Sequence, residues 1–129
     1  MTVLFDNDVY DKGLEHAKNN AERLVIMSDA PANYADAVSK IAFAVSVTGA
    51  DLIIADKAGG GREITVASKS GTIAVSTLNG TNDLHAALLD DTNSTILALT
   101  DETSDMSLNA GQSLTTPSFK FGFNAATQA

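Results

Sequence analysis

The residues of this chain that could do chemistry are mainly carboxylates gathered in short clusters. The segment from Asp6 to Asp8 begins like a calcium-binding loop, in which alternate side chains supply oxygen ligands. Tyr10 and Asp11 then stand where that loop requires an oxygen ligand and a glycine, and Ala17 replaces its closing glutamate. The pattern therefore favours an acidic, capped helix start over a calcium site.

Two further acidic clusters lie between segments that we expect to be strands. They are the pair Asp90 and Asp91 and the group of Asp101, Glu102 and Asp105. Aspartate is common in turns because its side chain bonds to the nearby backbone. We predict turn residues here, with a weak surface cation site as the open alternative, and we predict no metal or cofactor.

The histidines and the glycine run offer no recognisable catalytic frame. His16 is expected on a helix surface, and His85 at the start of an alternating strand, hydrogen-bonded at a sheet surface. Neither histidine accompanies a nucleophile elbow or a His-x-x-x-His pair. Gly59 to Gly61 precede Arg62 but lack the Gly-Lys-Ser/Thr ending of a phosphate-binding loop. The chain is not expected to be an enzyme, and a hydrolase is the least favoured hypothesis for its function.

Three phenylalanines near the C-terminus share one face of an expected strand: Phe119, Phe121 and Phe123. They could form a stacking platform for a ligand such as a sugar. Aromatic residues make up only 5% of the chain and tryptophan is absent, which favours core packing instead.

Charge and composition exclude several classes of function. The chain has 129 residues and a net charge of -8, with 8 basic residues against 16 acidic ones. Binding to phosphate backbones or anionic lipids needs a basic footprint, so neither a nucleic acid nor a membrane is an expected partner. The absence of cysteine excludes disulfides and thiol catalysis. No secretory leader is visible, which predicts a protein that is not secreted but folds in a cytoplasm.

The elements that would position these residues begin with a helix and continue mainly as strands. Apolar spacing predicts a helix over 7–21, a short strand over 23–28 and one or two helical turns over 34–40. From Ile41 the pattern alternates with period two. Further strands are predicted over 41–48, 51–55, 64–67, 73–76, 85–89, 95–99 and 118–123. Turn residues from Ser68 to Gly71 predict a hairpin that joins 64–67 to 73–76.

This order of elements predicts a mainly β (α+β) fold. We expect an antiparallel β-sandwich or small barrel with an N-terminal helix, in a single domain over 1–129. The helix-containing segment would cover 1–40, the sandwich or barrel 41–124, and a tail 125–129.

An ordered set of short segments carries a resemblance to a known class of proteins. These segments are Arg23–Ile26, Ala30–Pro31 with Tyr34, Gly61–Val66, Ile73–Val75, Leu84–Asp90, Ser94–Leu97, Leu108–Gln112 and Thr116–Phe119. Over most of its length the chain resembles small virion structural proteins of tailed bacteriophages, of the capsid decoration or cement type. The shared motifs are strands and turns, and no catalytic residue comes with them.

The resemblance implies a non-enzymatic protein on the capsid surface, assembled in the host cytoplasm. Its partner would be the major capsid protein or another virion protein, and it would be a homo-oligomer such as a trimer. A head–tail connector or tail component is the alternative, followed by a carbohydrate- or cation-binding β-sandwich. Expected mobility selects the candidate contacts. They are Thr2, Phe5, Gly59, Gly60, Gly61, Arg62, Asn124 and Gln128.

Overall fold

A computed structural model describes residues 7–58, 60–101 and 107–124. Two α-helices, one short 3₁₀ helix (Gly49–Asp51) and nine strands occur in this part of the chain, and every strand pairing is antiparallel. In chain order the α-helices and strands are α1 (Asn7–Asn20), β1 (Arg23–Met27), α2 (Tyr34–Ser39), β2 (Ile41–Ser46), β3 (Leu52–Asp56), β4 (Gly61–Val66), β5 (Ser70–Thr72), β6 (His85–Asp90), β7 (Thr95–Asp101), β8 (Ser113–Thr115) and β9 (Phe119–Asn124). The predicted mainly β fold with an N-terminal helix is confirmed. The described strands form three sheets and do not close into a barrel.

The largest sheet has the order β2-β1-β6-β7, so β1 lies at its centre although it precedes the predicted strand-rich region. Its last four residues are all buried, because both faces of the sheet are covered. Leu24 and Ile26 point into the main core, whereas Val25 and Met27 join a second apolar cluster. A continuous apolar strand is the expected pattern for burial on both faces.

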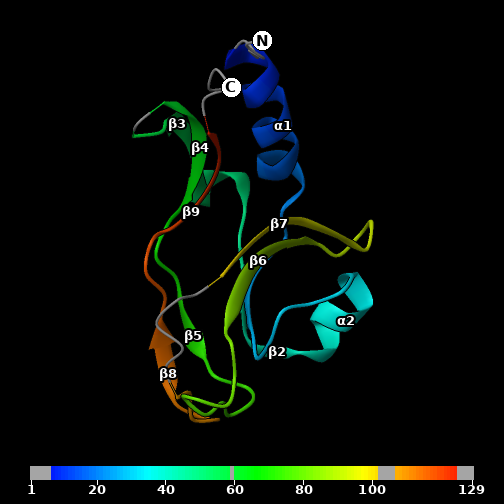
Figure 1. Cartoon of the computed structure of the whole chain (residues 1–129), viewed down its shortest axis with the longest axis vertical. Coiled ribbons are helices and arrows are strands. Elements are labelled where there is room, and N and C mark those ends of the chain that lie inside the picture. Colours follow the sequence, from blue (N-terminus) through cyan, green and yellow to red (C-terminus); the bar gives the residue numbers. More distant parts are fainter. Residues whose placement is uncertain (1–6, 59, 102–106, 125–129) are drawn as a thin grey trace.

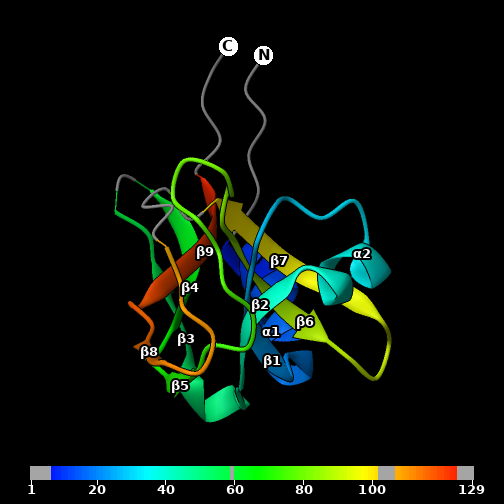
Figure 2. The same cartoon turned by 90° about the horizontal axis from the view of Figure 1, so that it is seen from below.

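The short helix α2 covers that second face. Asn33 caps the helix, and its Oδ1 accepts a hydrogen bond of 2.9 Å from the backbone N–H of Asp36. Ala37 is fully buried against Val25 and Met27. In both views α2 lies on the side of the four-stranded sheet away from β3, β4 and β9 (Figure 1 and Figure 2).

The second sheet has the order β3-β4-β9, and α1 packs against β4 and β3. Leu14 on α1, Ile64 on β4 and the phenylalanines Phe119 and Phe121 on β9 enter the main core. Core packing is therefore confirmed for these two aromatic side chains, and the side chain of Phe123 lies outside the described set. One apolar cluster joins α1 to both large sheets.

The predicted hairpin between 64–67 and 73–76 is wrong. β4 pairs with β3 and β9, and the chain then forms β5, which pairs with β8. Long-range hydrogen bonds replace the expected turn: Ser68 Oγ donates to the Thr116 carbonyl at 2.6 Å, and the Lys69 N–H donates to Thr116 Oγ1 at 2.9 Å. Thr116 is buried. These bonds therefore stabilise the segment that leads from β4 into β5, and the local turn residues do not predict them.

Candidate functional site

Three described elements that adjoin the predicted contact segments lie at one end of the molecule. Gly61 pairs with Asn124 across β4 and β9, and the turn between β3 and β4, the start of α1 and the end of β9 lie at the same end (Figure 1). Gly60 and Gly61 have φ angles of 108° and 94°, which favour glycine in this turn. Thr2, Phe5, Gly59 and Gln128 lie outside the described residues, as does the side chain of Asn124.

Arg62 forms two ion pairs within the chain. Its Nε lies 2.8 Å from Asp11 Oδ1 on α1, and its Nη1 lies 2.7 Å from Asp56 Oδ1 on β3. The hydrogen bonds to Asp11 and Asp56 raise the pKa of Arg62 above its ordinary value. Only 19% of the side chain is exposed. Arg62 therefore holds α1 beside the β3–β4 turn, which leaves little of it available for a partner.

The first of two polar clusters on the α2-covered face joins Arg23, Tyr34 and Asp91. Arg23 begins β1, Asp91 follows β6, and Tyr34 begins α2. Arg23 donates from Nε to Asp91 Oδ2 at 2.7 Å and from Nη2 to Oδ1 at 2.9 Å, and the Tyr34 hydroxyl donates to Oδ1 at 2.6 Å. The carboxylate thus has a bidentate cation and a phenol as partners.

The pKa values follow from this geometry. The Arg23 hydrogen bond holds the pKa of Asp91 below its usual value, and the Tyr34 hydrogen bond acts in the same direction. The same contact raises the pKa of Tyr34, because the neutral phenol is the hydrogen-bond donor. We refer to Arg23, Tyr34 and Asp91 as the closed cluster, since its charges compensate one another.

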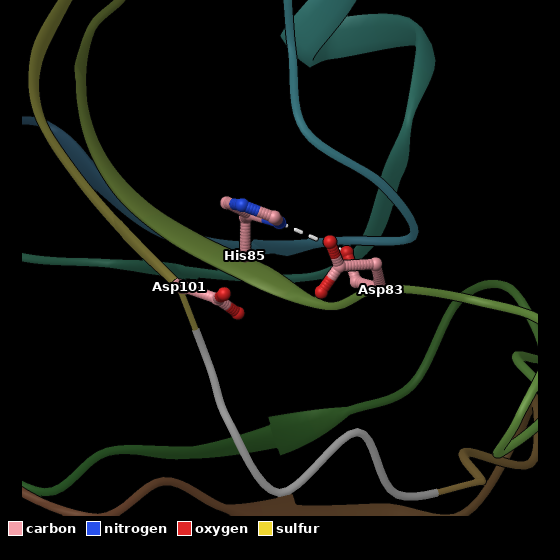
Figure 3. A group of neighbouring side chains, drawn as sticks. All are labelled: Asp83, His85 and Asp101. Atoms are coloured by element: carbon pink, nitrogen blue, oxygen red, sulfur yellow. Dashed lines mark hydrogen bonds between the residues drawn. The ribbon is translucent and has the colours of Figure 1, made fainter.

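The second polar cluster brings together Asp83, His85 and Asp101, as Figure 3 shows. One ring nitrogen of His85 and one carboxylate oxygen from each aspartate lie within 4.8 Å of one another. His85 Nδ1 lies 2.9 Å from the Asp83 backbone carbonyl oxygen, so the predicted hydrogen bond at a sheet surface is confirmed. His85 is half-buried, and the two aspartates are exposed. We refer to these three residues as the open cluster.

A further carboxylate lies beside the open cluster. Asp29 Oδ1 accepts a hydrogen bond of 3.3 Å from the backbone N–H of Asp83, and its Oδ2 accepts one of 3.4 Å from the Asn82 side chain. All eight lysines and arginines lie in the described part of the chain. None of them forms an ion pair with Asp29, Asp83 or Asp101 there. The negative charge at this cluster is therefore not compensated by a described side chain.

The predicted acidic clusters have different outcomes. Asp90 serves a turn, as predicted: its carboxylate accepts from the Asn93 backbone N–H at 3.1 Å and side chain at 2.8 Å. The hydrogen bond from the Asn93 side chain is the main reason that the pKa of Asp90 is lowered. Asp101 ends β7 instead of lying in a turn, and Glu102 and Asp105 lie outside the described residues.

An open groove of about 350 Å³ lies between α1, β7 and β9. Its lining is mostly apolar or small, and Lys120 is the single titratable side chain among the described residues that line it. The groove therefore lacks an acid–base pair or a nucleophile with a base. Its lining residues include Leu14, Ala17, Leu97, Ala98 and Phe121.

Comparison with known proteins adds no relative: no family model, no curated protein and no solved structure matches this chain. The phage resemblance thus stays a prediction from the sequence. None of the helices in the described residues is long and apolar enough to span a membrane.

Proposed function

We propose that this chain is a non-enzymatic structural protein of a phage virion, of the capsid decoration or cement type. The observation that carries the proposal is that the β3–β4 turn, the start of α1 and the end of β9 lie together at one end of the fold (Figure 1). Gly61 pairs with Asn124 there, and Arg62 fastens α1 through Asp11. An end of the fold built from three distant segments offers a surface for docking on a repeated lattice, where many weak contacts act together.

The outer face of the three-stranded sheet extends this surface. On the edge strand β3, Leu52 is buried and Ile54 packs against the core, so Ile53 points outward and is 62% exposed. Ile53 faces the same side as Thr65 and Lys120, which follow in register across the sheet. A large apolar side chain on a free sheet edge supports docking against another protein, here the major capsid protein.

The first experiment measures binding of the full chain to undecorated capsids. We expect saturable binding and at least a tenfold loss of affinity in Ile53→Lys. The matched control is Leu78→Lys, which alters a side chain of similar exposure in the segment between β5 and β6, at the other end of the molecule (Figure 1). Failure of the wild type to bind, or an equal loss in both variants, would contradict the proposed surface.

Copy number separates the leading function from its alternative. A decoration protein predicts hundreds of copies per particle and a homo-oligomer such as a trimer, whereas six or twelve copies would indicate a head–tail connector or ring. Quantitative mass spectrometry of purified virions measures this number, and absence from the particle would refute the virion assignment.

A further inference from the structure

We propose that the open cluster of Asp83, His85 and Asp101 is a binding site for a divalent first-row transition metal such as Zn²⁺. The inference does not depend on the capsid proposal. It rests on the convergence of one imidazole and two carboxylates where β6 begins and β7 ends (Figure 3). Imidazole and carboxylate together form a donor set typical of Zn²⁺ and its neighbours.

A β-bulge places Asp101 in the cluster. Near the turn, Asp90 pairs with Thr95 and Leu89 with Ile96, and the register then shifts between Leu88 and Leu89. Without this shift, continued pairing would place Thr100 opposite His85. With the shift, Asp101 lies directly opposite His85, so their side chains leave the same face of the sheet. Bulges commonly redirect a side chain in this way next to functional sites.

The hydrogen bond of His85 prepares the ring for coordination. The Asp83 backbone oxygen can only accept, so Nδ1 carries the proton in this contact and Nε2 of the neutral ring keeps its lone pair. Metal-binding histidines usually donate their second nitrogen to a carbonyl or carboxylate, which fixes the ring and makes it more basic.

The donor separation fits a cation after a small adjustment. A tetrahedral site with ligands at about 2.1 Å needs donor atoms about 3.4 Å apart. One ring nitrogen of His85 and one carboxylate oxygen from each of Asp83 and Asp101 already lie within 4.8 Å of one another. Asp83 and Asp101 are exposed, so their side chains can rotate without disturbing the core.

Local charge also favours a cation. Two carboxylates of the open cluster and the adjacent Asp29 have no lysine or arginine partner among the described residues. A divalent ion would relieve this repulsion. With three protein donors, water or a group from another molecule would complete the coordination, which predicts moderate affinity.

The test is calorimetric titration of the full chain with ZnCl₂, and with CaCl₂ for comparison. We expect one Zn²⁺ site per chain, tighter than any Ca²⁺ binding. His85→Gln is expected to weaken Zn²⁺ binding at least tenfold, and His16→Gln less than twofold. His16 is the matched control because it is the only other histidine and is exposed on α1.

Asp101→Asn provides a second variant, in which an exposed carboxylate is replaced by an isosteric amide. It should weaken Zn²⁺ binding at least fivefold while leaving the circular dichroism spectrum unchanged. The proposal is overturned if the wild type shows no saturable Zn²⁺ binding, if both histidine variants lose affinity equally, or if binding survives His85→Gln.

Discussion

The closed and open clusters lie on the same face of the same sheet but at opposite ends of it. Arg23 and Asp91 mark the end where β1 begins and β6 finishes, and His85 begins β6 opposite Met27. Each cluster contains aspartate and one nitrogen-bearing side chain. In the closed cluster a guanidinium and a phenol saturate one carboxylate, whereas the open cluster holds two carboxylates and an imidazole without a described cation.

This difference distinguishes charges that are neutralised within the fold from charges that have no described cationic partner. An arginine that is permanently protonated can neutralise a carboxylate inside the fold, so that pair needs nothing from solution. A histidine whose Nδ1 donates to a carbonyl offers a lone pair instead. The closed cluster is therefore expected to act on stability, and the open cluster on binding.

The largest expected effect on stability is at the closed cluster. Asp91→Ala removes three hydrogen bonds that involve a charged group and leaves Arg23 without its partner. We expect the free energy of unfolding to fall by about 2 kcal/mol. Urea denaturation measures it, and Asp56→Ala is the control, because Asp56 is exposed and Arg62 keeps Asp11. Equal effects in the two variants would contradict a special role for the closed cluster.

The same cluster predicts a pH dependence at the acid end. The pKa of Asp91 is lower in the folded chain than its ordinary value of 3.8, so its contribution is complete above about pH 4. It is lost as pH falls through the folded-state pKa. The difference in unfolding free energy between wild type and Asp91→Asn should therefore stay constant near neutrality and shrink in acid. A difference that grows as the pH falls would contradict the predicted direction of this pH dependence.

A smaller effect is expected at Tyr34. Tyr34→Phe removes one hydrogen bond to Asp91 but leaves the bidentate Arg23 contact and most of the packing on α2. Stability should fall by less than in Asp91→Ala. Because the pKa of Tyr34 is raised, its contribution is present below the ordinary pKa of tyrosine and is lost at alkaline pH. Thermal melts at neutral pH and above pH 10 measure both points.

The smallest effect on metal-free stability is expected at the open cluster. Asp101→Asn removes an exposed charge from a group of like charges, so unfolding free energy should change by no more than about 0.5 kcal/mol. Chemical denaturation in the presence of a chelator tests this. A loss as large as that of Asp91→Ala would mean that the open cluster is structural, and the contrast between the clusters would fail.

Much of the fold follows from residue patterns. Alternation predicts β2, β6, β7 and β9, and the apolar run after Arg23 predicts β1. Residue patterns do not predict the pairing of β5 with β8, because each strand has only three residues. The predicted hairpin is wrong because Ser68 and Lys69 bond to the distant Thr116. Turn propensities depend only on neighbouring residues, so they do not predict contacts between residues nearly fifty positions apart.

The open cluster was only partly predictable. The sequence pattern predicts His85 at the start of a strand, which the structure confirms, but it predicts Asp101 in a turn and indicates no role for Asp83. Their meeting depends on the bulge at Leu97, which shifts the partner of His85 from Thr100 to Asp101. The alternation of apolar and polar residues does not reveal a one-residue shift in the register between two strands. The signal that was present is the spacing of Asp83 and His85 by two residues at a strand entrance.

The most direct test of the open cluster is a long-range ¹H–¹⁵N spectrum of the histidine rings during addition of Zn²⁺. The chain has two histidines, so the two ring systems can be followed separately. We expect the His85 nitrogen signals to shift and saturate at one equivalent of Zn²⁺ while those of His16 stay in place. Parallel, non-saturating shifts of both rings, or no shift at His85, would contradict it.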